Sequence, residues 1–188
     1  MDAARDIDAV APAAAALRAW LPDADVVTHH RRAARAAPDA LWEAARSIRL
    51  DETRALGRLV RWRIPGTPAA LPYAELFARA PFTVLDEGDR WSVSGLCGRI
   101  WTLTRDYPEL PDREAFLSWS AAGTVRVAFG HWVEETPHGV VLVSEARVQA
   151  VDRWAALRLR SLWLAVAPFE RLIATEPLAL AARRAAGQ

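Results

Sequence analysis

Two neighbouring apolar runs near the end of the chain, followed directly by one long helical pattern, constrain the fold more than any other feature. Val125–Val133 and Val140–Val151 are rich in β-branched residues and flank a short turn around Pro137, which predicts a β-hairpin. From Asp152 onward, apolar residues recur every three or four positions, the spacing of a helix with one buried face. We therefore expect a sheet covered by its own C-terminal helix.

The ends and interruptions of this helix can also be predicted. Asp152 is a good N-cap, because its carboxylate can accept hydrogen bonds from the first free backbone amides. Pro168 interrupts the pattern, which predicts a kink. Thr175 and Pro177 are typical of a fresh helix start, so we expect a second helical segment that continues to Arg184.

The preceding sequence predicts shorter elements. We expect a strand within Asp25–Ala36, helices from Pro38 and over Asp51–Leu59, a loop over Arg61–Pro72, a helical turn over Tyr73–Arg79, strands over Phe82–Leu85 and Trp91–Thr104, and a helical turn or irregular edge over Arg113–Trp119. Gly95 and Gly98 inside a strand indicate a bulge or bend. The sum is one α+β domain over residues 25–188, after an Ala-rich arm or short helix over residues 1–24.

Composition excludes several classes of function. The formal net charge of +1 offers no overall attraction for nucleic acid, and no nucleic-acid partner is expected. The chain has no Lys, which excludes a Schiff base or a phosphate-loop lysine, and no Asn, which excludes a Cys–His–Asn triad. No metal site or cofactor is expected, because the sequence has no helical His–His spacing for a metal.

The same composition bears on the compartment. Cys97 is the single cysteine, so an intramolecular disulfide is impossible, which suits a reducing cytoplasm. Residues 1–17 carry acidic groups before any apolar stretch and lack the features of a signal peptide. No uncharged apolar window of about 18 residues exists, so we expect no membrane span. The sequence leaves the oligomeric state open.

The order of elements resembles the helix-grip fold of the START-like, or SRPBCC, superfamily, and in particular bacterial polyketide cyclase/dehydrase-like members of unknown function. Residues 37–42, Ala-Pro-Asp-Ala-Leu-Trp, look like the segment that leaves the first strand in that family. Residues 144–148, Ser-Glu-Ala-Arg-Val, followed by Asp152, look like the family's last strand and helix start, and residues 98–101, Gly-Arg-Ile-Trp, are also similar to bacterial relatives.

The resemblance covers roughly residues 25–185 and implies a curved antiparallel sheet wrapped around a long C-terminal helix. Members of the superfamily bind lipids, polyketides, hormones or other apolar molecules between sheet and helix, and some cyclise or dehydrate polyketides. They share no single catalytic motif, so the resemblance assigns no catalytic residue here.

Strand alternation suggests which side chains face the helix. Val125, Val127, Phe129, His131 and Val133 share one strand face, and it is the more apolar one, so we place it toward the helix.

If Val133 pairs with Val141, then Glu145 and Arg147 share the face of His131 and can pair with each other or with Arg99. A planar guanidinium there would suit a ligand carboxylate, phenol or keto oxygen. A register slip of one residue would instead make Glu145 and Arg147 an ordinary ion pair on the other side.

Further assignments remain open at this point. His131 and Glu145 are candidate proton-transfer groups, and His131 is alternatively a hydrogen-bonded core residue. Cys97 with His131 could form a nucleophile pair, whereas a lone strand cysteine is usually inert packing. His29 and His30 are expected at a solvated edge. Among the nine Trp residues, Trp101 and Trp163 are the candidates for lining a pocket rather than filling the core.

The favoured function is binding of a small hydrophobic or aromatic molecule between sheet and helix. Its candidate ligand-binding residues are Arg99, Trp101, Phe129, His131, Glu145, Arg147 and Trp163. One alternative is a cyclase or dehydratase acting on a polyketide-like substrate through pocket His, Glu and Arg groups. The other is a protein-interaction module whose pocket is collapsed.

Overall fold

The computed structural model describes residues 12–102, 106–137 and 139–187, which contain one open antiparallel sheet with the strand order β1-β5-β4-β3-β2. The strands are β1 (Val26–Ala34), β2 (Thr83–Gly88), β3 (Trp91–Gly98), β4 (Val125–Thr136) and β5 (Gly139–Ala150). The predicted hairpin is confirmed, since β4 and β5 pair from Val125–Ala150 to Thr136–Gly139.

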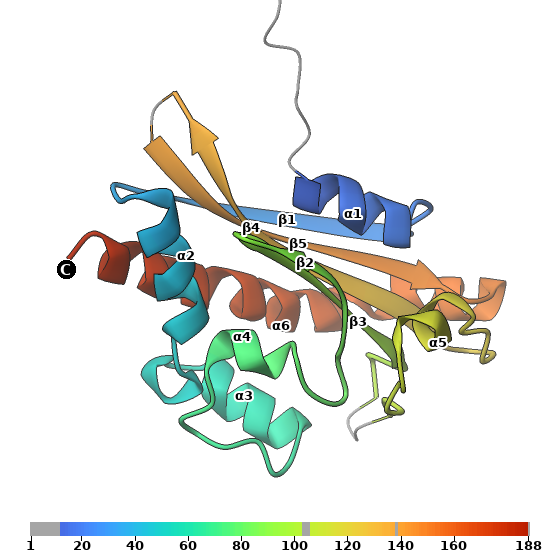
Figure 1. Ribbon diagram of the computed structural model, residues 1–188. Coiled ribbons are helices and arrows are strands. Elements are labelled where there is room, and N and C mark those ends of the chain that lie inside the picture. The colour runs from blue at the N-terminus through green and yellow to red at the C-terminus, as the bar shows by residue number, and fades with distance from the viewer. Residues whose placement is uncertain (1–11, 103–105, 138, 188) are drawn as a thin grey trace, which may run out of the picture.

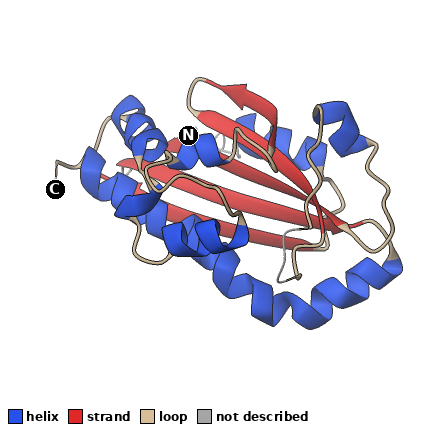
Figure 2. Ribbon diagram, turned by 90° about the horizontal axis from the view of Figure 1, so that it is seen from below, coloured by secondary structure: helices blue, strands red, loops and turns tan. Residues whose placement is uncertain are grey.

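Helices cover both sides of this sheet, which confirms the α+β class. They are α1 (Pro12–Trp20), α2 (Pro38–Ser47), α3 (Leu56–Arg63), α4 (Tyr73–Leu76), α5 (Arg113–Leu117) and α6 (Arg153–Ala185), with a 3-10 turn over Leu50–Glu52. Figure 1 shows α6, α2, α3 and α4 on one side of the strands and α1 on the other. Figure 2 shows the bent path that α6 follows along the sheet.

Side-chain alternation gives the sheet two different faces. The inner face, packed on α6, carries Val125, Val127, Phe129, His131 and Val133 of β4 and Leu142, Ser144, Ala146 and Val148 of β5. The outer face, packed on α1 and α5, carries Arg126, Ala128, Gly130 and Trp132 of β4 and Val143, Glu145 and Arg147 of β5. The β4 face expected toward the C-terminal helix is therefore the inner one, as predicted.

Helix α6 starts as predicted and runs to Ala185 as one helix, not as the two segments expected. The Asp152 carboxylate accepts hydrogen bonds from Trp154 N and Ala155 N, both at 2.8 Å, and these bonds lower the pKa of Asp152. The second helix start at Thr175 is wrong, because α6 continues through Pro168 and Pro177. The Thr175 hydroxyl donates to the carbonyl of Arg171 at 2.7 Å, inside the helix, and so does not act as a cap.

Two other boundaries differ from expectation. The helix expected over Asp51–Leu59 is split, because the Thr53 hydroxyl turns the chain by donating to Leu50 O at 2.6 Å and accepting from Gly57 N at 2.8 Å. Strand β3 stops at Gly98, whose φ of 138° ends the extended run. A Cβ at Gly98 would lie 2.1 Å from the carbonyl oxygen of Asp106, so glycine is required there.

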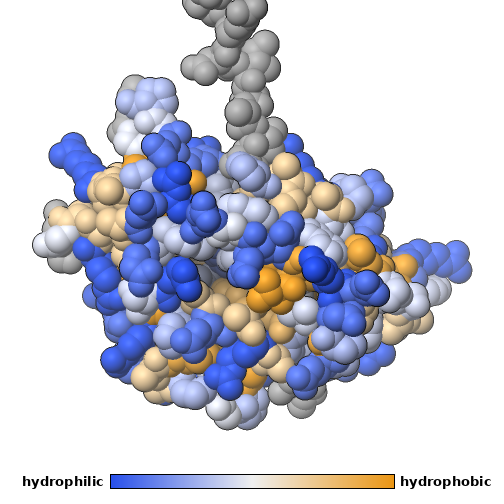
Figure 3. Space-filling model, in the orientation of Figure 1, coloured by the Kyte–Doolittle hydropathy of each residue, from blue (hydrophilic) through white to orange (hydrophobic). Residues whose placement is uncertain are grey.

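Within the described ranges, no helix combines the length and apolar character that crossing a membrane requires. In the orientation of Figure 1, hydrophilic residues cover much of the surface, with apolar groups exposed between them (Figure 3).

Candidate functional site

A cavity of about 310 Å³ lies between α3, α6 and the inner face of the sheet. Its volume is at the lower end of the range of roughly 300–1,000 Å³ typical of ligand pockets. Apolar side chains dominate its wall. They include Leu56, Val60 and Trp62 of α3, Phe77 directly after α4, Val127 and Phe129 of β4, Ala146 and Val148 of β5, and Trp163, Val166 and Phe169 of α6.

Three of the predicted pocket residues do line this cavity. Phe129 comes from the inner face of β4, Trp163 from the middle of α6, and Trp101 from the segment after β3. The rings of Trp62 and Phe169, 6.3 Å apart and nearly parallel, stack between α3 and α6. Aromatic rings from four separate segments thus surround one hollow space.

The predicted register that placed Glu145 and Arg147 in the pocket is wrong by one residue. Val133 pairs with Leu142, so Ser144 lies opposite His131, and Glu145 lies opposite Gly130 on the outer face. Glu145 and Arg147 are absent from the cavity wall. Apolar residues occur on both faces of β5, with Val143 on the face of Glu145 and Arg147 and Val148 on the other. The apolar pattern therefore did not indicate the strand register.

On the outer face these two residues support α1 instead. Arg147 donates to the carbonyls of Leu21 at 2.8 Å and Pro22 at 3.1 Å, which follow the last turn of α1. Buried Glu145 lies 3.3 Å from Arg147 Nη1 and 3.2 Å from Nδ1 of His29. Arg147, paired with Glu145, therefore links the end of α1 to the outer face of the sheet.

Arg99 also lies away from the cavity wall. Its Nη1 donates to the carboxylate of Asp106 at 2.8 Å, and its Nε donates to the carbonyl of Gly123 at 3.4 Å. The guanidinium bridges two loops at the end of β3 and does not pair with Glu145 or Arg147. The predicted cluster of Arg99, His131, Glu145 and Arg147 is therefore not assembled.

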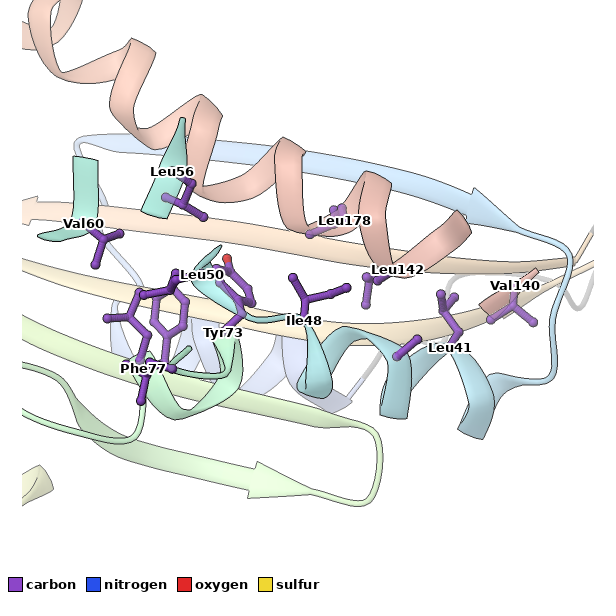
Figure 4. Packing of buried hydrophobic residues seen from close by; sticks show 14 residues of the cluster. Leu41, Ile48, Leu50, Leu56, Val60, Tyr73, Phe77, Val140, Leu142 and Leu178 are labelled. Atoms are coloured by element: carbon purple, nitrogen blue, oxygen red, sulfur yellow. The ribbon is translucent and has the colours of Figure 1, made fainter. Parts of the chain in front are cut away.

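His131 is a buried residue in a hydrogen-bonded chain that reaches α6. Tyr73 donates its hydroxyl proton to the carbonyl of Ile173 at 2.9 Å, and Nε2 of His131 lies 3.0 Å from the same hydroxyl oxygen. Figure 4 shows this hydroxyl directed toward α6. The Ile173 carbonyl is available because the residue four positions later is Pro177, which has no N–H.

Burial controls the protonation of this chain. It lowers the pKa of His131 to about 4 and raises the pKa of Tyr73. Both side chains are therefore neutral at pH 7.

His131 lies on the inner face, whereas the Cys97 side chain packs in the core of the outer face, and burial raises the pKa of Cys97 to about 12. These positions separate His131 from both Cys97 and Glu145, so neither predicted catalytic pair converges.

His131 and Tyr73 do not line the 310 Å³ cavity, whereas Glu170 of α6 lies in its wall and is hydrogen-bonded to β1. Its carboxylate accepts from the Thr28 hydroxyl at 2.6 Å and from Nε2 of His30 at 3.1 Å. The expected solvated edge is confirmed in part, because β1 is an edge strand and the His29 side chain is 41% exposed, whereas that of His30 is only 22% exposed. Each ring faces a carboxylate, His29 on the outer face and His30 on the inner one.

Helix α3, the opposite wall, is positioned by a carboxylate from α6. Glu176 accepts hydrogen bonds from the backbone N–H groups of Arg54, Ala55 and Leu56, the last at 3.0 Å. Those N–H groups belong to the start of α3, where the N-cap residue Ala55 has no side-chain acceptor to offer. The cap thus comes from a residue about 120 positions away in the sequence, and it fixes the distance between two cavity walls.

Arg63, in the last turn of α3, brings a positive charge to the cavity wall. Its Nη2 donates to the hydroxyl of Tyr107 and lies 3.4 Å from the carbonyl of Ile100, while the guanidinium stacks 4.9 Å from the Tyr107 ring centre. Its Nη1 is buried without a hydrogen-bond partner in the described part of the chain. Sequence analysis did not single out Arg63, because the Pro- and Gly-containing stretch Arg61–Pro72 predicted a loop, and it gave no signal that Tyr107 lies beside it.

The chain was compared with protein-family models and with curated proteins. No protein-family model matches the chain, and no curated protein matches its sequence.

Proposed function

We propose that this protein binds a small hydrophobic or aromatic molecule in the cavity between the inner face and α6, in a helix-grip arrangement. The carrying observation is the cavity itself, about 310 Å³ enclosed mostly by apolar and aromatic side chains. The interaction-module alternative requires a filled interior, so this cavity volume supports the binding proposal over it. Binding gains free energy as apolar surfaces of ligand and wall leave water.

The first experiment measures binding of the uncharged fluorescent probe N-phenylnaphthylamine, whose emission rises in apolar surroundings. The matched variants are Ala146→Leu, which adds three carbons to the cavity wall, and Ala33→Leu, the same change at an exposed position of β1. We expect the wild-type protein and Ala33→Leu to bind the probe equally and Ala146→Leu to bind it more weakly. No binding by the wild type, or equal binding by all three, contradicts the proposal.

Thermal unfolding provides an independent readout. A molecule that binds only the folded state at about 100 times its Kd stabilises it by about 2.7 kcal/mol. We expect the probe to raise the Tm of the wild type and of Ala33→Leu, and to raise that of Ala146→Leu less.

A further inference from the structure

We propose that the ligand is an apolar carboxylic acid whose carboxylate binds Nη1 of Arg63. The inference deepens the function proposed above and rests on it. It starts from one observation, a cationic side chain that contributes to the wall of an apolar cavity and has a buried donor atom without a partner.

The charge of Arg63 has no counter-ion among the described residues. An arginine side chain stays positively charged at neutral pH. Tyr107, its hydrogen-bond partner, is a neutral phenol, since burial raises the pKa of that hydroxyl. Glu170 is the carboxylate in the described cavity wall, and it is paired with Thr28 and His30 and forms no ion pair with Arg63.

The compensation that Arg63 does receive is partial. The aromatic face of Tyr107 and the C-terminal end of α3 both carry partial negative charge, and neither amounts to a full anion. Burying a charge is costly unless it is paired and hydrogen-bonded. An anionic group of the ligand would supply both, because it brings a formal negative charge and lone pairs for the N–H groups of Nη1.

The arrangement favours a carboxylate over a phosphate. Nη2 is already engaged with Tyr107 and Ile100, and Nη1 has almost no exposed surface, so a turn of the guanidinium toward the cavity would present the two N–H groups of Nη1 to one small anion. A single guanidinium balances one negative charge, whereas a phosphate monoester carries about −1.5 to −2 at pH 7. The remaining wall is apolar, so the rest of the ligand is expected to be an aliphatic chain or an aromatic ring system.

The test compares decanoate with decanamide, and naphthoate with naphthamide, in competition with N-phenylnaphthylamine. Within each pair the two molecules have nearly the same size and differ in charge. We expect the wild type to bind each acid about ten- to a hundredfold more tightly than its amide, the range that corresponds to charge-assisted hydrogen bonds.

The key variant is Arg63→Met, which keeps an unbranched apolar stem and removes the guanidinium. Arg58→Met is the matched control, because Arg58 lies on the same helix, is exposed and is absent from the cavity wall. We expect Arg63→Met to bind the acid and the amide of each pair equally, and Arg58→Met to keep the preference for the acid.

The outcomes separate the two proposals. If the wild type binds the probe but does not distinguish acid from amide, or if Arg63→Met retains the preference, the Arg63 site is wrong and the binding function stands. If Arg63→Met loses the probe as well, circular dichroism and the Tm show whether it is folded. A folded Arg63→Met that binds no probe contradicts a purely anionic role for Arg63. Failure of the wild type to bind any probe overturns the function itself.

Discussion

The two faces of this sheet are formed by the same five strands, but the outer face is closely packed and the inner face borders a cavity. On the outer face, Trp132 and Phe116 are almost completely buried, and Leu17 of α1 fills the remaining space. A Cβ added at Gly130 would lie 3.0 Å from Leu17 Cδ2, so little room remains there. The inner face leaves about 310 Å³ empty beneath α6.

The difference lies in what covers each face. The outer face meets α1, a helix of nine residues whose buried side is made of Ala13, Ala14 and Leu17, so its backbone can approach the strands closely. The inner face is packed against α6 and α2, and α3 faces it across the cavity, tied to α6 by the Glu176 cap. Bulky rings such as Trp163 and Phe169 stand around the gap without filling it. Hollow and filled cores therefore depend on the covering helices more than on the strands.

The largest expected effect tests the filled face. Phe116 on α5 is fully buried, and Phe129 on β4 borders the cavity. Phe116→Ala is expected to lower the free energy of unfolding by about 3–5 kcal/mol. Phe129→Ala is expected to lower it less, because part of the Phe129 surface already faces empty space. Urea denaturation of both variants measures the difference. Equal losses would contradict the contrast between the two faces.

The second prediction concerns pH and the buried histidine of the inner face. The pKa of His131 is about 4 in the folded protein, below the value of about 6.5 expected for an unfolded chain. The unfolded state therefore takes up a proton that the folded state does not. The resulting stability is complete above pH 6.5 or so and is lost as the pH falls toward 4, a loss of about 3 kcal/mol.

This loss is measured by urea denaturation at pH 7 and pH 4 in three proteins. His131→Gln should show about 3 kcal/mol less pH dependence than the wild type over this range. His29→Gln serves as the control, because the His29 side chain lies on the outer face and is 41% exposed. This variant keeps His131 and should therefore retain the pH dependence of stability that His131 causes. If His131→Gln loses as much stability on acidification as the wild type does, burial is not what sets the protonation of His131.

The third prediction adds volume to each face. A Cβ at Gly95 would lie 2.7 Å from the ring of Phe116 on the outer face, so Gly95→Ala is expected to destabilise the protein by about 1–3 kcal/mol. Ala146→Leu adds more atoms on the inner face, where space exists, and is expected to change stability by less than Gly95→Ala does. Thermal and urea unfolding of both variants test this ranking, and the reverse ranking would show that the hollow is not on the inner face.

The smallest expected effect compares one helix cap from each side. Glu176→Ala removes the cap of α3, and Asp112→Ala removes that of α5, where the carboxylate accepts from Ala115 N at 2.8 Å. Each change is expected to cost about 0.5–2 kcal/mol. Only Glu176→Ala should also weaken binding of N-phenylnaphthylamine, because α3 forms a cavity wall. Equal probe binding by both variants would mean that the Glu176 cap does not shape the cavity.

Local signals predicted most of the elements correctly. The β-branched runs around Pro137 gave the hairpin, and Asp152 gave the first turn of α6, because hairpins and caps depend on neighbours in sequence. The end of β3 was missed, because the Gly98 turn is set by the backbone of Asp106. Thr175 gave a false helix start, since its hydroxyl turned back to Arg171.

The site was predicted only in part, for a related reason. Trp101, Phe129 and Trp163 could be placed from alternation and helical spacing. Glu145 and Arg147 could not be placed in this way, because their face depends on which residues of β4 and β5 pair with each other. A shift of one residue in this pairing exchanges the two faces. The position of Arg63 in the cavity wall depends on the packing of α3 beside the Ile100–Thr102 segment, and no local sequence pattern indicates that packing.

Pro177 has a consequence for the orientation of α6. Apolar packing is non-directional and by itself allows a helix to rotate about its axis, whereas the hydrogen bond from Tyr73 to Ile173 is directional. Rotation by one residue, about 100°, would turn a different carbonyl toward Tyr73. The imino acid thus selects the angle at which α6 presents Trp163, Val166 and Phe169 to the interior, from a position outside the space that these side chains enclose.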